Sequence, residues 1–104
     1  KICVLVLSML FSMSLSSGVD TMGVAVDENG VLILTANNFY DALLSFETLL
    51  VEFYSPSCPH CTHFAPNYAE AAKKLSQLEP PIRAAKIDCT QRNTYQIQRE
   101  MGIQ

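Results

Sequence analysis

The sequence lacks tryptophan, an excess of basic residues and any apolar run long enough to cross a bilayer. Seven lysines and arginines stand against ten aspartates and glutamates, which gives a formal net charge of −3 at pH 7. Nucleic-acid binding needs a basic face for the phosphates, so the composition argues against that class of partner. With 49% hydrophobic residues among 104, the chain can build one packed domain.

The first 18 residues have the layout of a secretory signal peptide. Lys1 precedes the apolar run of residues 2–11, and serines and Gly18 follow it. The run is shorter than the roughly 20 residues of a membrane helix, whereas a basic start, a short apolar stretch and a small-residue exit are typical of a secretory signal. A buried strand or helix is the alternative. We expect cleavage between residues 14 and 18, and no membrane anchor in the mature chain because no second apolar segment follows.

The cysteines are too few and too unevenly spaced for a disulfide scaffold. Cys3 lies within the predicted signal peptide, so Cys58, Cys61 and Cys89 remain, an odd number. A scaffold needs an even number at wide spacings. A pair separated by two residues, with a distant single cysteine, favours a redox motif and a spare thiol. We expect Cys89 to be buried and inert.

Hydrophobic periodicity predicts alternating strands and helices after a flexible, polar lead-in at residues 19–30. Thr35 is the expected cap of the first helix, and Pro66 should kink the second. The order β-α-β-α-β-α predicts a parallel sheet with helices packed on its faces. The predicted strands are residues 31–34, 48–54 and 82–88, and the predicted helices are residues 37–46, the cysteine motif to about 78, and 90–101.

The sequence Cys58-Pro59-His60-Cys61 follows the strongest predicted strand and opens the second helix. Thiol–disulfide exchange needs a thiolate that attacks and a second thiol that resolves the mixed disulfide. Proline favours the first helical position, so Cys58 should cap the helix, where free N–H groups and the helix dipole stabilise its anion. Cys58 is therefore the expected nucleophile, and Cys61, one turn inside, the expected resolving cysteine.

His60 lies between the two cysteines, and two readings of it are open. A partly cationic imidazole would stabilise the Cys58 thiolate and lower its pKa, which favours donating disulfides over reducing them. The alternative is a solvated helix residue.

Metal and haem sites fit the same residues less well. Covalent haem attachment requires histidine directly after the second cysteine, where this chain has Thr62, with His63 one position later. A zinc site could be assembled on paper from Cys58, Cys61, His63 and Cys89, but a second closely spaced pair is missing. We expect no metal and no cofactor.

The motif and its flanks resemble a catalytic domain of the protein disulfide isomerase family. The likeness rests on residues 50–61, 64–66 and 84–90, and it extends from about Gly30 to Gln104. Residues 28–32 and 79–82 are most similar to the multi-domain isomerases of the endoplasmic reticulum (ER). The resemblance implies a thioredoxin-like, three-layer α/β/α fold and an ER-lumenal enzyme that oxidises or isomerises disulfides in client proteins. Glutathione or an ER oxidase would be its redox partner.

Four positions match functional residues of that family. Cys58 and Cys61 match its nucleophilic and resolving cysteines, Glu52 matches a buried acid thought to accept the proton of the second cysteine, and Lys86 matches a strand lysine near that acid. The residues themselves agree, because a carboxylate within the apolar strand 48–54 is costly unless it is paired or working. An edge position that reaches solvent is the alternative for Glu52.

The chain departs from the family pattern in three places. Ser57 stands where the family usually has tryptophan, and Pro59 replaces glycine, which gives the dipeptide of a bacterial disulfide oxidant and favours an oxidising site. The thioredoxin fold continues with a cis-proline loop, two antiparallel strands and a helix, which the chain does not contain after its third predicted helix. We therefore expect residues 31–104 to be a truncated thioredoxin domain. A client-binding chaperone module with weak redox activity, or a small zinc-binding protein, are the alternatives.

Overall fold

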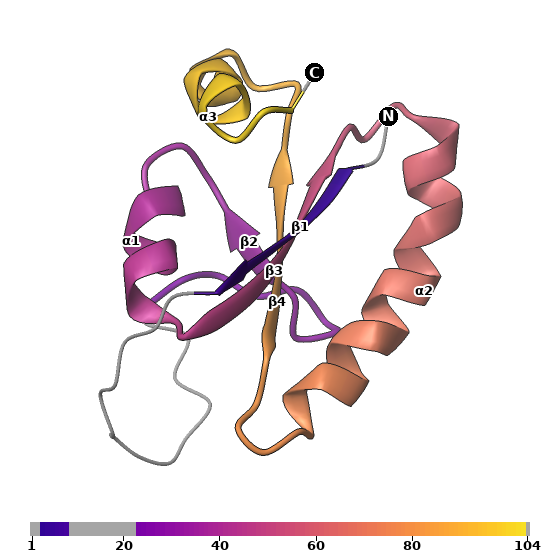
Figure 1. Ribbon diagram of the computed structural model, residues 1–104. Helices are drawn as coiled ribbons and strands as arrows, with labels where there is room; N and C mark the ends of the chain where they lie inside the picture. The colour runs from indigo at the N-terminus through magenta and orange to yellow at the C-terminus, as the bar shows by residue number, and fades with distance from the viewer. Residues whose placement is uncertain (1–2, 9–22, 104) are drawn as a thin grey trace.

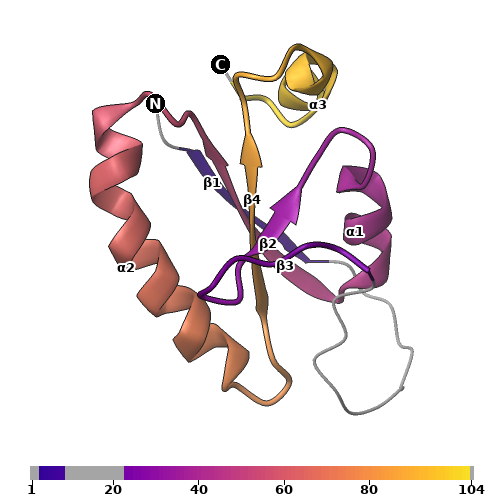
Figure 2. The same ribbon diagram turned by 180° about the vertical axis from the view of Figure 1, so that it is seen from behind.

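A computed structural model describes residues 3–8 and 23–103 of the chain. In them, one sheet separates a long helix on one side from two shorter helices on the other, which gives three layers (Figures 1 and 2). The elements are β1 (Cys3–Ser8), β2 (Leu32–Leu34), α1 (Phe39–Ser45), β3 (Thr48–Tyr54), α2 (Pro59–Ser76), β4 (Arg83–Asp88), the 3-10 helix η1 (Arg92–Thr94) and α3 (Tyr95–Glu100).

From β2 onward, the elements follow the predicted β-α-β-α-β-α order, and the three-layer α/β/α fold is confirmed. The strand at residues 48–54 has the predicted bounds, while β2 and β4 each begin one residue later. The predicted cap at Thr35 is wrong, because α1 begins only after Asn38. The Thr35 hydroxyl oxygen instead accepts a hydrogen bond from the N–H of Asn37 at 3.3 Å, a local turn that competes with helix formation.

The sheet is mixed rather than wholly parallel, because β1 pairs antiparallel with β3 along the outer edge. The strand order is β1-β3-β4-β2, and the β3–β4 and β2–β4 pairs are parallel. Sequence reasoning placed no strand at residues 3–8, since it assigned them to a signal peptide. In the fold, β1 pairs the edge groups that β3 would otherwise expose. Processing of residues 1–18 stays a prediction, and residues 1–2 and 9–22 lie outside the described part.

Residues 23–30, which include the described part of the predicted lead-in, are tied to β2. Val26 forms an isolated antiparallel bridge with Leu32, and the N–H of Ile33 donates to the Ala25 carbonyl oxygen at 2.8 Å. The chain then turns at Gly30, whose φ of +80° lies in the left-handed region that glycine adopts without strain. This turn brings Asp27 close to the sheet.

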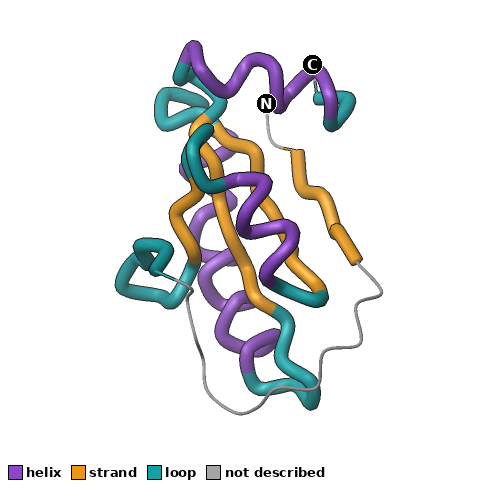
Figure 3. The backbone as a smooth tube through the Cα atoms, turned by 90° about the vertical axis from the view of Figure 1, so that its left-hand side faces the viewer, coloured by secondary structure: helices purple, strands orange, loops and turns teal. Residues whose placement is uncertain are grey.

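Side chains of β3 alternate between two cores, as expected for a central strand covered on both faces. Leu49, Val51 and Phe53 are buried against α1 and α3. Leu50 lies on the opposite face and packs against the smaller core beside α2. Figure 3 shows the strands between the helices in side view. The positions between Leu49, Val51 and Phe53 therefore face α2, and Glu52 is one of them.

Helix α2 is fixed to the sheet by a buried tyrosine. The hydroxyl of Tyr68 lies 2.6 Å from the carbonyl oxygen of Ala85 and 2.9 Å from that of Leu50, so it bridges β3 and β4. Pro66 lies inside α2, which runs unbroken from Pro59 to Ser76. Across residues 3–8 and 23–103, no helix is both long and apolar enough to span a membrane.

Replacing Tyr68 by phenylalanine should lower the free energy of unfolding by about 1 kcal/mol, because the carbonyl oxygens of Leu50 and Ala85 lose the hydroxyl that they share. Urea denaturation followed by circular dichroism measures this change. Tyr95→Phe is the matched control, since that side chain is half exposed. Equal stability of the two variants would contradict the anchoring role of the Tyr68 hydroxyl.

Candidate functional site

The cysteine motif lies where β3 passes into α2. Only residues 55–58 separate the two elements, and Cys58, the last of them, is the N-cap residue of α2 with extended backbone angles (φ −84°, ψ 120°). The N–H of Cys58 donates to the Ser55 carbonyl oxygen at 3.1 Å, and its own carbonyl accepts from the N–H of Thr62 at 3.1 Å. Pro59 occupies the first helical position, where its missing N–H leaves no donor unsatisfied. The predicted placement of both residues agrees with the structure.

The two thiols of the motif differ in burial and in the direction of their pKa shifts. Cys58 is half-buried, whereas Cys61 is only 4% exposed. Burial raises the pKa of Cys61, and the nearby Cys58 sulfur raises it further. The pKa of Cys58 is lowered, and the backbone N–H of Cys61 contributes to this shift.

Opposite pKa shifts in adjacent thiols suit a stepwise exchange. The thiol with the lower pKa ionises first and attacks, while the thiol with the higher pKa keeps its proton until the second step. Cys58 at the helix cap has the properties of the nucleophile, and Cys61 those of the resolving cysteine. His60 is exposed in the first turn of α2, and its backbone N–H also lowers the pKa of Cys58. A role for its imidazole stays a prediction.

Glu52 is buried in the middle of β3, with 4% of its surface exposed. The alternative edge position is wrong, because β1 and β4 flank β3 and bring Val4 and Lys86 into register with Glu52. Burial raises the pKa of Glu52, and the charge of Lys86 only partly opposes this shift. A carboxyl group in this setting can hold a proton at higher pH than an exposed glutamate.

Lys86 binds a carboxylate that sequence reasoning did not single out. Its Nζ lies 3.0 Å from Oδ2 of Asp27 and 5.9 Å from the centre of the Tyr54 ring. Burial acts to lower the pKa of Lys86, but the hydrogen bond and the negative charge of Asp27 leave it raised. The sequence Asp27-Glu28-Asn29-Gly30 signals a turn, but it does not reveal a partner 59 residues away.

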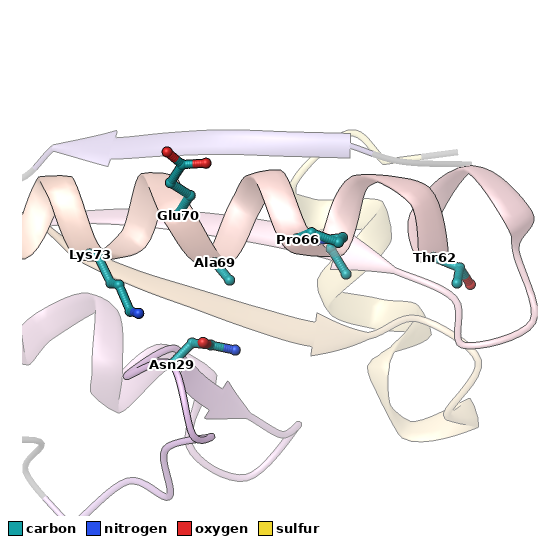
Figure 4. Close-up of a pocket in the computed structure, with 7 residues that line it drawn as sticks. Asn29, Thr62, Pro66, Ala69, Glu70 and Lys73 are labelled. Atoms are coloured by element: carbon teal, nitrogen blue, oxygen red, sulfur yellow. The ribbon is translucent and has the colours of Figure 1, made fainter.

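The arrangement of possible metal ligands and the groove beside α2 both bear on what the site could bind. In the part of the chain that the structure describes, no three His, Cys, Asp or Glu side chains gather as metal ligands. A groove between α2 and the Asn29 turn is not lined by Cys58 or Cys61 (Figure 4). Its lining consists of Asn29, Thr62, Ala65, Pro66, Ala69, Glu70 and Lys73.

Iodoacetamide should alkylate Cys58 faster than Cys61, with a rate that reaches half its plateau below the pH of about 8.5 typical of a free cysteine. A lowered pKa supplies thiolate at lower pH, and burial slows reaction at Cys61. Peptide mass spectrometry after timed alkylation measures both rates. Faster reaction at Cys61 would contradict these assignments.

Glu52→Gln should raise the free energy of unfolding at pH 7–8 but change it little near pH 4. The folded pKa of Glu52 is raised, so wild-type stability is lost as pH rises from its ordinary value of about 4.5 through the folded pKa. Glutamine cannot ionise and avoids that loss. Urea unfolding at both pH values measures the difference. The exposed Glu79→Gln is the control, and an equal gain in both variants would argue against a buried charge at Glu52.

The chain matches one protein family and is similar to several known proteins. The family described as Thioredoxin matches residues 30–103. A protein disulfide-isomerase of Drosophila melanogaster is 49% identical over 63 residues, and the human protein disulfide-isomerase A4 is 48% identical over 64 residues. The solution structure of the first thioredoxin domain of mouse protein disulfide-isomerase A4 superposes with a TM-score of 0.60 at 45% identity.

The matched regions cover most of this chain but little of the relatives. They span 61% of this chain and 13% of the Drosophila protein, and 62% of this chain and 10% of the human protein. The structural match covers 74% of this chain and 54% of the mouse domain. The likeness thus concerns one domain, or part of one, in much longer relatives.

Proposed function

This chain belongs to the thioredoxin family, and we propose that Cys58 and Cys61 carry out thiol–disulfide exchange with client proteins. The observation that carries the proposal is the position of Cys58 at the N-cap of α2, with the buried Cys61 three residues into the helix. Relatives at 48–49% identity that are named protein disulfide-isomerase support the same reaction class.

The reaction follows from the two thiols. The Cys58 thiolate attacks one sulfur of a client disulfide, so that a Cys58–client disulfide forms and the other client sulfur leaves as a thiolate. The Cys61 thiol then loses its proton and attacks the Cys58 sulfur, which closes a Cys58–Cys61 disulfide and releases the second client thiol. The reverse sequence oxidises a client dithiol. Isomerisation requires only the first step and a second attack by a client thiolate.

Glu52 is the proposed acceptor of the Cys61 proton. Burial raises the pKa of Glu52, so its carboxylate is a stronger base than that of an exposed glutamate. Proton transfer is most effective when the pKa of the base lies near the working pH. Lys86, in register with Glu52, provides the positive charge beside this acceptor.

We place this activity in the lumen of the endoplasmic reticulum. The predicted signal peptide at residues 1–18 and the relatives named protein disulfide-isomerase support this location. Glutathione or an ER oxidase would restore the Cys58–Cys61 disulfide after a client has been oxidised. Unfolded and disulfide-containing proteins would be the clients.

Cys58→Ala should abolish disulfide exchange, because it removes the attacking sulfur, while Cys61→Ala should accumulate mixed disulfides that cannot be resolved. The assay is recovery of activity by a scrambled disulfide-bonded substrate, with trapped species separated on non-reducing gels. Cys89→Ala is the control, since Cys89 lies outside the motif and packs against the core. It should keep wild-type turnover.

Unchanged turnover in Cys58→Ala would exclude the proposed reaction. Titration in glutathione redox buffers separates this function from client binding alone. A defined midpoint for the Cys58–Cys61 pair supports exchange, whereas two thiols that do not respond to the buffer support a binding module.

A further inference from the structure

We propose that Asp27 is a positioning residue for the Glu52 proton acceptor, because its carboxylate binds Lys86 and holds the positive charge of that lysine away from Glu52. This inference rests on the proposed function, in which Glu52 accepts the proton of Cys61. It concerns the turn that precedes β2, which sequence reasoning treated as a lead-in.

The turn holds the Asp27 carboxylate in one orientation. Its Oδ1 accepts hydrogen bonds from the N–H of Asn29 at 2.8 Å and of Val31 at 3.0 Å. The main chain of Asp27 donates to the Val31 carbonyl oxygen at 3.0 Å and accepts from the N–H of Gly30 at 3.1 Å. These bonds occupy Oδ1 and leave Oδ2 for Lys86. The Asp27 side chain is only 13% exposed, so solvent screens this pair less than a surface pair.

Lys86 faces two carboxyl groups and forms an ion pair with one of them. It lies on β4 opposite Glu52 of β3, yet its Nζ forms the 3.0 Å ion pair with Asp27. An ammonium group held by one carboxylate has part of its charge neutralised and its donors directed away from a second. The effect on Glu52 is consistent with this, since burial outweighs the opposing charge of Lys86.

Other described groups also lie near Glu52. From α2 comes the Tyr68 hydroxyl, which is bonded to strand carbonyls, and from β3 itself comes Tyr54. On β1 the opposite residue is the apolar Val4. Among the described residues, Lys86 is therefore the cation that interacts with Glu52. A contact that moves the ammonium group of Lys86 changes the pKa of the Glu52 carboxyl.

The test measures protonation of Glu52 directly. The full chain is labelled with ¹³C at the side-chain carboxyl carbons, and NMR titration follows Glu52 in wild type, Asp27→Asn and Glu28→Gln. Asparagine keeps an oxygen for the Asn29 and Val31 donors but loses the charge that binds Lys86. Glu28 is the matched control, because it is an exposed neighbour in the same turn with the same charge.

In Asp27→Asn, Glu52 should titrate at lower pH than in wild type, because Lys86 becomes available to its carboxylate. In Glu28→Gln, Glu52 should titrate as in wild type. Glu52 titration at the same pH in both variants would overturn the proposal. A general loss of packing in Asp27→Asn would change the resonances of all buried groups together, not that of Glu52 alone. Amide spectra of the variant monitor such a loss.

A second variant tests the Asp27–Lys86 ion pair even if Asp27→Asn does not fold. In Lys86→Met, the Asp27 carboxyl should titrate at higher pH than in wild type, because it loses its partner. An unchanged Asp27 titration would overturn the proposal. None of these titrations requires turnover. Wild-type protein without exchange activity would refute the proposed function, whereas the titrations alone decide the role of Asp27.

Discussion

Only four residues, 55–58, join β3 to α2, so the end of a buried strand lies next to the start of a long helix. β3 and β4 are parallel, so their carboxyl ends lie at the same edge of the sheet, which is where parallel α/β sheets place their sites. The N–H of Cys89, directly after β4, donates to the Tyr54 carbonyl oxygen at 2.8 Å and joins the two ends. This edge fixes Cys58 at the positive end of the helix dipole.

Glu52, six residues before Cys58 and within β3, has surroundings that disfavour a negative charge, opposite to those of Cys58. Around Cys58, hydrogen-bond donors favour an anion, whereas around Glu52 burial disfavours one. A nucleophile that ionises easily and a carboxyl that keeps its proton to higher pH than an exposed glutamate therefore lie on one continuous segment. This contrast comes from the geometry of the chain, since a helix start exposes free N–H groups and the middle of a covered strand exposes none.

Sequence reasoning succeeded where local chemistry decides structure. The apolar run of residues 48–54 ends at Ser55-Pro56-Ser57, so the bounds of β3 could be predicted, and Pro59 identified the first helical position. Burial of Glu52 followed from its apolar neighbours. The pairing of β1 with β3 was missed, because its apolar run fits a signal peptide equally well. The Asp27–Lys86 ion pair was missed because it depends on how β2 is placed beside β4.

The Asp27–Lys86 ion pair lies away from β1. Asp27 precedes β2, and Lys86 lies on β4, so the pair is on the side of β3 away from β1 in the order β1-β3-β4-β2. On β1, Val4 and Val6 are 38% and 67% exposed, so that strand adds little apolar cover to the face that carries Glu52. The described groups that interact with Glu52 include Lys86 of β4 and the Tyr68 hydroxyl of α2.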